Sequence, residues 1–143
     1  MKDIMIKIVG KQVTENNEES KIEFVTEGRI FKKGTSMYII YEETELAGLE
    51  GCTTSLKING DQVKLKRYAE SKGGEDTTIF FQKGKRFESV YNTAAGPLEL
   101  EVLTNELSID FDEELLKGKI DIDYDISIRG LFDGRSFLNV EVM

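Results

Sequence analysis

The feature that most constrains the fold is a two-residue alternation of apolar and polar side chains. The clearest example is the stretch 120–129, in which isoleucine and tyrosine alternate with aspartate, serine and arginine. Successive side chains of a β-strand point to opposite faces, so this pattern predicts a strand with one buried and one solvated face. A chain built from such segments has to bury one face of every strand.

Glycine and other turn residues divide the chain into strand-like runs with this pattern. We expect ten strands, at about 3–13, 21–32, 35–45, 52–58, 61–69, 76–82, 85–93, 97–111, 119–132 and 135–142. Only residues 112–118 have helical signals, and an extended hairpin end is equally compatible with them. The regular spacing predicts an antiparallel meander.

Two hairpins can be given a register, because apolar side chains have to lie opposite apolar ones. A two-residue type I′ loop at 59–60 places Leu56 opposite Val63. In the last hairpin, a three-residue loop at 132–134 with a left-handed Gly134 in a G1 bulge gives the best match of apolar positions.

Ten strands with one apolar face each either pack as two sheets or close into a barrel. Closure removes the exposed strand edges that promote aggregation. The short connections favour a closed antiparallel up-and-down barrel, and a Greek-key sandwich is the alternative. Because the chain has 143 residues, we expect one all-β domain over residues 1–143.

The composition limits the classes of partner. The chain has 19 Lys and Arg against 27 Asp and Glu, a net charge of −8, which disfavours nonspecific binding to nucleic acid. Lys57, Lys64 and Lys66 share a strand face, but no aromatic residues are interleaved with them in the sequence. No apolar run has the length of a signal peptide or membrane span, and a single cysteine fits a reducing compartment. We expect a soluble cytoplasmic protein without nucleic-acid or membrane partners.

The residues that most often carry catalysis and metal binding are scarce. The absence of histidine excludes Ser-His-Asp and Cys-His catalysis and the usual zinc and copper sites. Cys52 is expected opposite Arg67, where a cation would activate the thiol, but a small buried cysteine is the simpler interpretation. Asp121, Asp123 and Asp125 lack the glycine and glutamate of a calcium loop and are interpreted as a solvated outer face. No cofactor, metal or catalytic residue is predicted.

Several motifs resemble those of a known family. They are Tyr41-Glu42-Glu43-Thr44-Glu45-Leu46, Gly48-Leu49-Glu50-Gly51-Cys52-Thr53-Thr54, Gly84-Lys85-Arg86 with Ser89, Tyr91, Thr93 and Gly96, Leu98-Glu99-Leu100-Glu101-Val102, and Ile120-Asp121-Ile122-Asp123-Tyr124. In order and spacing they resemble the YwiB-like family of uncharacterised bacterial proteins over nearly the whole chain. The resemblance implies a closed antiparallel barrel of eight to ten strands, lipocalin-like and of the calycin group. It implies no catalytic motif, so no functional residue is carried over.

Polar side chains at inward-facing positions are the candidate functional residues. Arg67, Ser89 and Tyr91 share strand faces with apolar residues, and either Glu42 or Glu43 continues an inward face. We predict that these residues orient a small amphipathic or anionic ligand in the barrel lumen. The alternative is that they satisfy one another in a filled core. An enzyme that uses one of the carboxylates with Tyr91 is the least favoured function, because the two groups would have to converge in a cleft.

A second candidate feature is a strand that is apolar on both faces, at Ile79, Phe80 and Phe81. One of its faces has to be covered by a partner protein, by a second copy of the chain or by residues 112–118. Phe80 and Phe81 are therefore candidate interface residues. The alternative function is a protein–protein interaction module or a homodimer.

Overall fold

The computed structural model describes residues 2–14, 16–42, 53–68, 77–93, 96–112, 114–130 and 132–143. These residues form ten strands: β1 (Lys2–Thr14), β2 (Glu19–Lys33), β3 (Ser36–Glu42), β4 (Thr53–Asn59), β5 (Gln62–Tyr68), β6 (Thr77–Gln82), β7 (Arg86–Thr93), β8 (Gly96–Asp112), β9 (Lys117–Ile128) and β10 (Phe132–Val142). They agree closely with the predicted runs. Residues 114–116 form a turn, so segment 112–118 is a hairpin end. Over the described ranges, no helix is long and apolar enough to cross a membrane.

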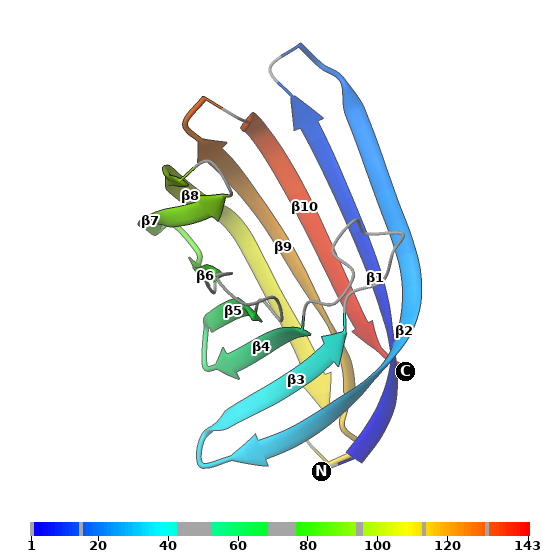
Figure 1. Ribbon diagram of the computed structural model, residues 1–143. Helices are drawn as coiled ribbons and strands as arrows, with labels where there is room; N and C mark the ends of the chain where they lie inside the picture. The colour runs from blue at the N-terminus through cyan, green and yellow to red at the C-terminus, as the bar shows by residue number, and fades with distance from the viewer. Residues whose placement is uncertain are drawn as a thin grey trace.

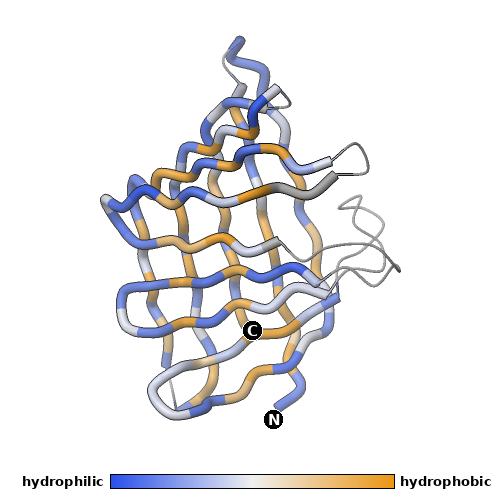
Figure 2. Tube along the Cα trace, turned by 60° about the vertical axis from the view of Figure 1, so that its left-hand side comes forward, coloured by the Kyte–Doolittle hydropathy of each residue, from blue (hydrophilic) through white to orange (hydrophobic). Residues whose placement is uncertain are grey.

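All ten strands belong to one antiparallel sheet in the order β6-β5-β4-β3-β2-β1-β10-β9-β8-β7. Strands that follow one another in the chain are paired neighbours except β6 and β7, which form the two ends of the sheet, and β1 also pairs with β10. The sheet curls until its two ends, β6 and β7, approach each other (Figure 1). The result is a nearly closed barrel, in which the short strands cross in front of the long ones (Figure 2). The predicted up-and-down barrel is confirmed, and the sandwich alternative is wrong.

The sheet has its open seam between β6 and β7, in the middle of the chain. The turn that joins them lies on β8: Gly84 N donates to Thr104 O at 2.9 Å, and Thr104 N donates to Lys85 O at 3.2 Å. The termini are instead sealed into the wall by the β1–β10 ladder. This arrangement places the two free strand edges next to each other.

The core consists of the inward-facing side chains of these strands. On β1 they are Ile4, Ile6 and Ile8, and the alternation predicted from sequence continues on the other strands. One irregularity occurs in β8, where Asn105 is the extra residue of a bulge between Thr104 and Glu106. A bulge moves the following residues to the opposite face. It explains how a 17-residue strand keeps its apolar side chains inside although their numbering changes from even to odd.

The β4–β5 hairpin turns one residue later than predicted. Gly60 has φ = 60° and occupies the first central position of the turn, as in type II′. Leu56 therefore lies opposite Leu65 and not opposite Val63. The partner changes by two residues, so every side chain keeps its predicted face.

The last hairpin also differs from its prediction. Ile128 pairs with Phe132, so the loop lies at 129–131, and the left-handed glycine is Gly130 (φ = 77°) instead of Gly134. The backbone N–H of Arg129 donates to a β8 carbonyl at 3.0 Å, which holds the loop at the end of the neighbouring strand. The shift is again an even number of residues, so the isoleucines of β9 still face inward.

Gly28 lies on the long, curved strand β2 (Figure 1), opposite Ile4 of β1 and Tyr41 of β3. A Cβ at this position would clash with Ile6 Cδ1 and would lie 2.7 Å from the Ile40 carbonyl oxygen. The backbone oxygen cannot move without breaking the ladder. We expect Gly28→Ala to lower the free energy of unfolding by about 1–3 kcal/mol in urea denaturation.

The matched control is Gly10→Ala on the adjacent strand β1. Gly10 also faces inward, but a Cβ there would meet no atom within 4 Å. This variant is expected to equal or slightly exceed the wild-type stability, because alanine reduces the entropy of the unfolded chain. Equal stability of both variants would contradict the steric argument.

Candidate functional site

The barrel interior has a packed half and an open half. In the packed half the inward side chains are almost fully buried, as Ile6, Ile30 and Ile39 are at 0% exposure. In the open half, Ile22 faces inward opposite Gly10 and yet is 43% exposed. Inward-facing Leu138, Ile126 and Ile128 are also only partly buried. The interior is thus accessible from the end of the barrel at which the open half lies.

A group of polar side chains lies inside the barrel, and we call it the interior polar cluster. Thr54 and Arg67 are direct partners on β4 and β5. Thr104, Tyr124 and Ser136 form one row across β8, β9 and β10. The hydroxyl-bearing residues Thr54, Thr104 and Ser136 are only 0%, 1% and 2% exposed.

Tyr124 connects the two parts of this cluster. Its ring packs against Phe81 with centroids 4.8 Å apart. Burial raises the pKa of Tyr124, and the nearby Ser136 hydroxyl and the positive charge of Arg67 oppose this rise. Arg67 on β5 and Tyr124 on β9 both occupy inward-facing positions of the barrel wall.

Two hydroxyls of the cluster are buried without an ordinary hydrogen bond. Thr104 Oγ1 and Ser136 Oγ have no partner with hydrogen-bond geometry among the residues that the structure describes. Most buried hydroxyls in proteins have such a partner. The interior therefore offers hydrogen-bonding capacity together with a partly buried, inward-facing guanidinium.

The predicted lumen residues fall into three groups. Arg67 faces inward and its Nε is buried, and Ser89 is half-buried on the inner face opposite Leu100. Glu42 is exposed and follows the inward-facing Tyr41, so it lies on the outer face and the prediction that it could line the lumen is wrong. It lines an open groove of about 990 Å³ along β1, β2 and β3.

The remaining predictions concern residues outside the described part of the chain. They are Glu43, the side chain of Tyr91, and Cys52. The expected pairing of Cys52 with Arg67 is wrong, because Thr54 occupies the position opposite Arg67. The predicted pairing is wrong because the prediction places the β4–β5 loop one residue too early in the sequence.

Sequence reasoning missed Thr104, Tyr124 and Ser136. The only signal was that Tyr124 interrupts a series of inward-facing isoleucines in 120–128. Thr104 immediately precedes the bulge, where the alternation changes. Ser136 lies opposite Tyr124 only in the observed register of the last hairpin.

Of the two candidate interface residues, one lies inside the barrel. Phe81 is 1% exposed and packs in the core, so its predicted role in an interface is wrong. Phe80 lies on the outer face at 40% exposure, and its ring meets Phe87 edge to face at 5.3 Å across the seam. Only Phe80 is accessible to another molecule.

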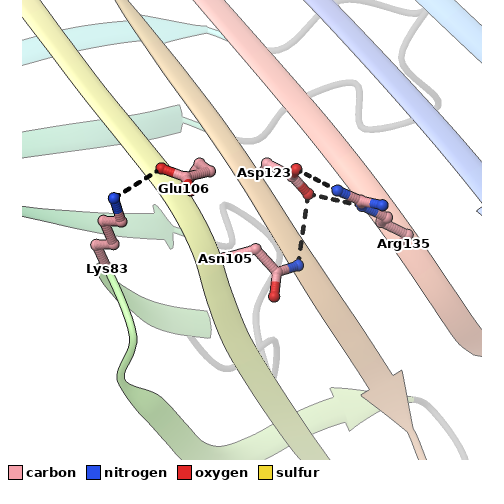
Figure 3. Close-up of polar contacts among 5 residues, drawn as sticks. All are labelled: Lys83, Asn105, Glu106, Asp123 and Arg135. Carbon is pink, nitrogen blue, oxygen red and sulfur yellow. Dashed lines mark hydrogen bonds and ion pairs between the residues drawn. The ribbon is translucent and has the colours of Figure 1, made fainter.

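The aspartates of β9 lie on the outer face, as predicted, and are held by polar partners. Asp123 accepts two hydrogen bonds from Arg135 at 2.9 and 2.5 Å, and Asn105 of the bulge also donates to it (Figure 3). These bonds, led by that from Arg135, lower the pKa of Asp123. Asp121 accepts from Asn139 at 2.6 Å. No three Cys, Asp or Glu side chains of the described residues are grouped closely enough to hold a metal ion.

Comparison with known proteins identifies the family. Residues 6–139 match the domain of unknown function DUF1934. The chain belongs to this family. The uncharacterized beta-barrel protein YwiB of Bacillus subtilis (strain 168) is 29% identical over 117 residues, which are 81% of this chain and 76% of YwiB.

A solved structure supports the same relationship. The crystal structure of the ywiB protein from Bacillus subtilis superimposes with a TM-score of 0.76 and 26% identity, over 98% of this chain and 91% of that chain. The predicted YwiB-like family and the barrel are therefore confirmed. This DUF1934 protein shares its architecture with a relative that is itself described only as an uncharacterised barrel.

The buried phenol predicts a pH effect at alkaline pH. Tyr124 has a raised pKa, so the stability it contributes is fully present below about pH 10, the ordinary value for tyrosine, and is lost as the pH rises through the higher folded pKa. In urea unfolding between about pH 8 and 11, Tyr124→Phe should reduce the alkaline loss of stability.

Tyr68→Phe is the matched control, because Tyr68 is exposed on the outer face. This variant should lose stability with pH as the wild type does. The same alkaline profile for wild type and Tyr124→Phe would show that Tyr124 ionises as a solvated tyrosine.

Proposed function

We propose that this DUF1934 barrel is a nonenzymatic binding protein for a small amphipathic anion. The anionic group lies at the interior polar cluster, and the apolar part extends along the open half. The observation that carries the proposal is the combination of an inward-facing guanidinium, buried hydroxyls and accessible apolar wall in one interior. Pockets for small molecules typically combine an apolar lining with a few convergent polar groups.

The proposed position of the ligand's anionic group rests on the charge and the hydrogen-bonding capacity of the interior polar cluster. Arg67 supplies a positive charge with several N–H donors. Thr104 supplies a buried hydroxyl that has no hydrogen-bond partner among the described residues, and Ser136 supplies a buried hydroxyl beside the Tyr124 phenol. A buried hydroxyl without a partner costs about 1–3 kcal/mol, so a carboxylate or similar oxygen that accepts from it recovers this energy.

The apolar part follows from the shape of the open half. Next to Gly10 there is space on the inner face, since a Cβ would meet no atom within 4 Å. Ile22, its partner on β2, is 43% exposed to that space. A hydrocarbon chain placed there buries apolar surface at about 25 cal/mol per Å².

Dansylated undecanoic acid is a suitable probe, because it combines a carboxylate, an alkyl chain and an environment-sensitive fluorophore. We expect saturable binding, with affinity reduced about tenfold or more in Arg67→Gln, because a charge-assisted hydrogen bond contributes about 1.5–3 kcal/mol. The neutral amide of the same probe should bind the wild type as weakly as the acid binds Arg67→Gln.

Gly10→Val tests the position of the chain without removing a charge. It fills the open half from the inner face and should abolish binding while the protein remains folded. Val9→Leu is the control, since Val9 is the adjacent residue on the outer side of the same strand. Undiminished binding in Gly10→Val, or equal affinity for acid and amide, would exclude the proposed site.

The alternative function, a protein–protein interaction module, is supported by only one of its two predicted interface residues. With Phe81 in the core, the doubly apolar strand offers Phe80 alone, and Phe87 covers part of its ring. A single half-exposed aromatic is common on protein surfaces. We therefore place the ligand-binding function first.

A further inference from the structure

The outer face of β2–β6 has a row of aromatic and lysine side chains, which we call the aromatic–lysine row. Its members lie directly opposite one another on five neighbouring strands: Phe31, Tyr38, Lys57, Lys64 and Phe80. The strands β3, β4 and β5 that carry its centre are stacked in order in Figure 1. These residues are far apart in sequence, and only the pairing of the strands brings them into one row.

The members of the row contact each other. Phe31 and Tyr38 stack with centroids 4.9 Å apart and an angle of 8°. Lys57 Nζ lies 5.8 Å from the Tyr38 ring, and Lys64 Nζ lies 5.4 Å from the Phe80 ring. Two neighbouring lysines thus lie between aromatic rings, and each lysine contacts the ring beside it.

A second pair extends the cationic surface beside the row. Lys66 Nζ lies 4.9 Å from the ring of Tyr68 on the same outer face of β5. Tyr68 is 39% exposed and Phe80 is 40% exposed, so both rings are accessible. About four residues of strand separate Lys64 from Tyr68, which places the two rings roughly 13 Å apart.

The charge distribution of this face is unfavourable in the isolated protein. Lys57 and Lys64 are direct cross-strand partners, and like charges in such pairs are destabilising. Neither lysine forms an ion pair with a residue in the described ranges. Among the described outward-facing positions of β3–β6, Glu42 at the end of its strand is the only carboxylate, whereas β2 carries Glu19, Glu23 and Glu27 on this face. A chain of net charge −8 therefore concentrates lysines where an external anion would relieve their repulsion.

We propose that the outer face of β2–β6 binds single-stranded nucleic acid. Phosphates lie between Lys57 and Lys64, and bases stack on the accessible rings of Phe80 and Tyr68. Sheet faces with exposed aromatics and interleaved cations bind single strands in this way, since every base has a ring face and every linkage a charge. A protein partner fits less well, because lysine is depleted in protein–protein interfaces.

This proposal revises the expectation drawn from composition. The composition disfavours nucleic acid through the net charge of −8 and through the lack of aromatic residues interleaved with the three lysines in the sequence, and the cross-strand register supplies aromatic neighbours for the lysines. The acidic remainder of the chain still repels a polyanion, so binding should be weak and salt-dependent. Three phosphate contacts correspond to a slope of log K against log salt of about −2 for a single strand.

The test is fluorescence anisotropy of a labelled oligothymidylate of about 12 nucleotides at low salt, with an oligouridylate of equal length in parallel. The Phe80→Ala/Tyr68→Ala variant should weaken binding about tenfold or more, because each stacked base contributes substantially. The Lys57→Gln/Lys64→Gln variant should weaken binding and make the salt slope shallower by about 1.4. Binding of either oligonucleotide with this dependence supports the proposal.

The chain contains a matched control for both substitutions. On β1 and β10, Lys11 Nζ lies 5.9 Å from the ring of Phe137, a similar pair outside the proposed site. Lys11→Gln/Phe137→Ala should therefore bind oligonucleotides as the wild type does. Thermal unfolding of all three variants verifies that they are folded.

Three results would overturn the proposal. The first is no binding of either oligonucleotide at low salt. The second is binding that the Phe80→Ala/Tyr68→Ala variant retains in full, or that the control variant loses to the same extent. The third is tighter binding of poly-glutamate or of vesicles with anionic lipid than of either oligonucleotide, which would make the face a general polyanion surface.

Discussion

The pairing of β1 with β10 is the interaction on which the rest of the structure depends. The first strand forms ladders with both β2 and the last strand, and this joins two series of hairpins into one continuous sheet. Without that ladder, the inward faces of Ile6 and Val140 would lie at exposed edges. With it, the sheet curls around one core, and in the packed half of the barrel the apolar faces are buried against the opposite wall.

Closure at the termini leaves the seam between β6 and β7, and aromatic side chains fill it in place of a ladder. Phe80, on the outer face of β6, meets Phe87 of β7, which also packs against the core, and inside the barrel Phe81 meets Tyr124. Consecutive residues of one strand thus pack against two different elements on opposite sides of the wall. The contact between Phe81 and Tyr124 buries the inner apolar face of β6 within the barrel, so this face needs no partner protein.

The two proposed binding regions lie on opposite faces of the same strands. On β5, Arg67 belongs to the interior polar cluster, whereas Lys64 and Lys66 belong to the outer cationic face. Their separation depends only on the two-residue period of the strand. A slip by a single residue would exchange the faces, but the buried Val63 and Leu65 make such a slip costly.

The sequence by itself determined the ten strands, the alternation of inward and outward side chains along most of them, the barrel and the inward orientation of Arg67. These properties depend on local alternation, and they survived errors in both hairpin loops because each error shifted the register by an even number of residues. The tertiary structure alone decided which side chains meet. The bulge at Asn105 and the loop before Phe132 placed Thr104 and Ser136 beside Tyr124, and the ladders of β2–β6 aligned lysines with aromatics. Such partners depend on turn conformation and long-range pairing, which the alternation of a single strand does not encode.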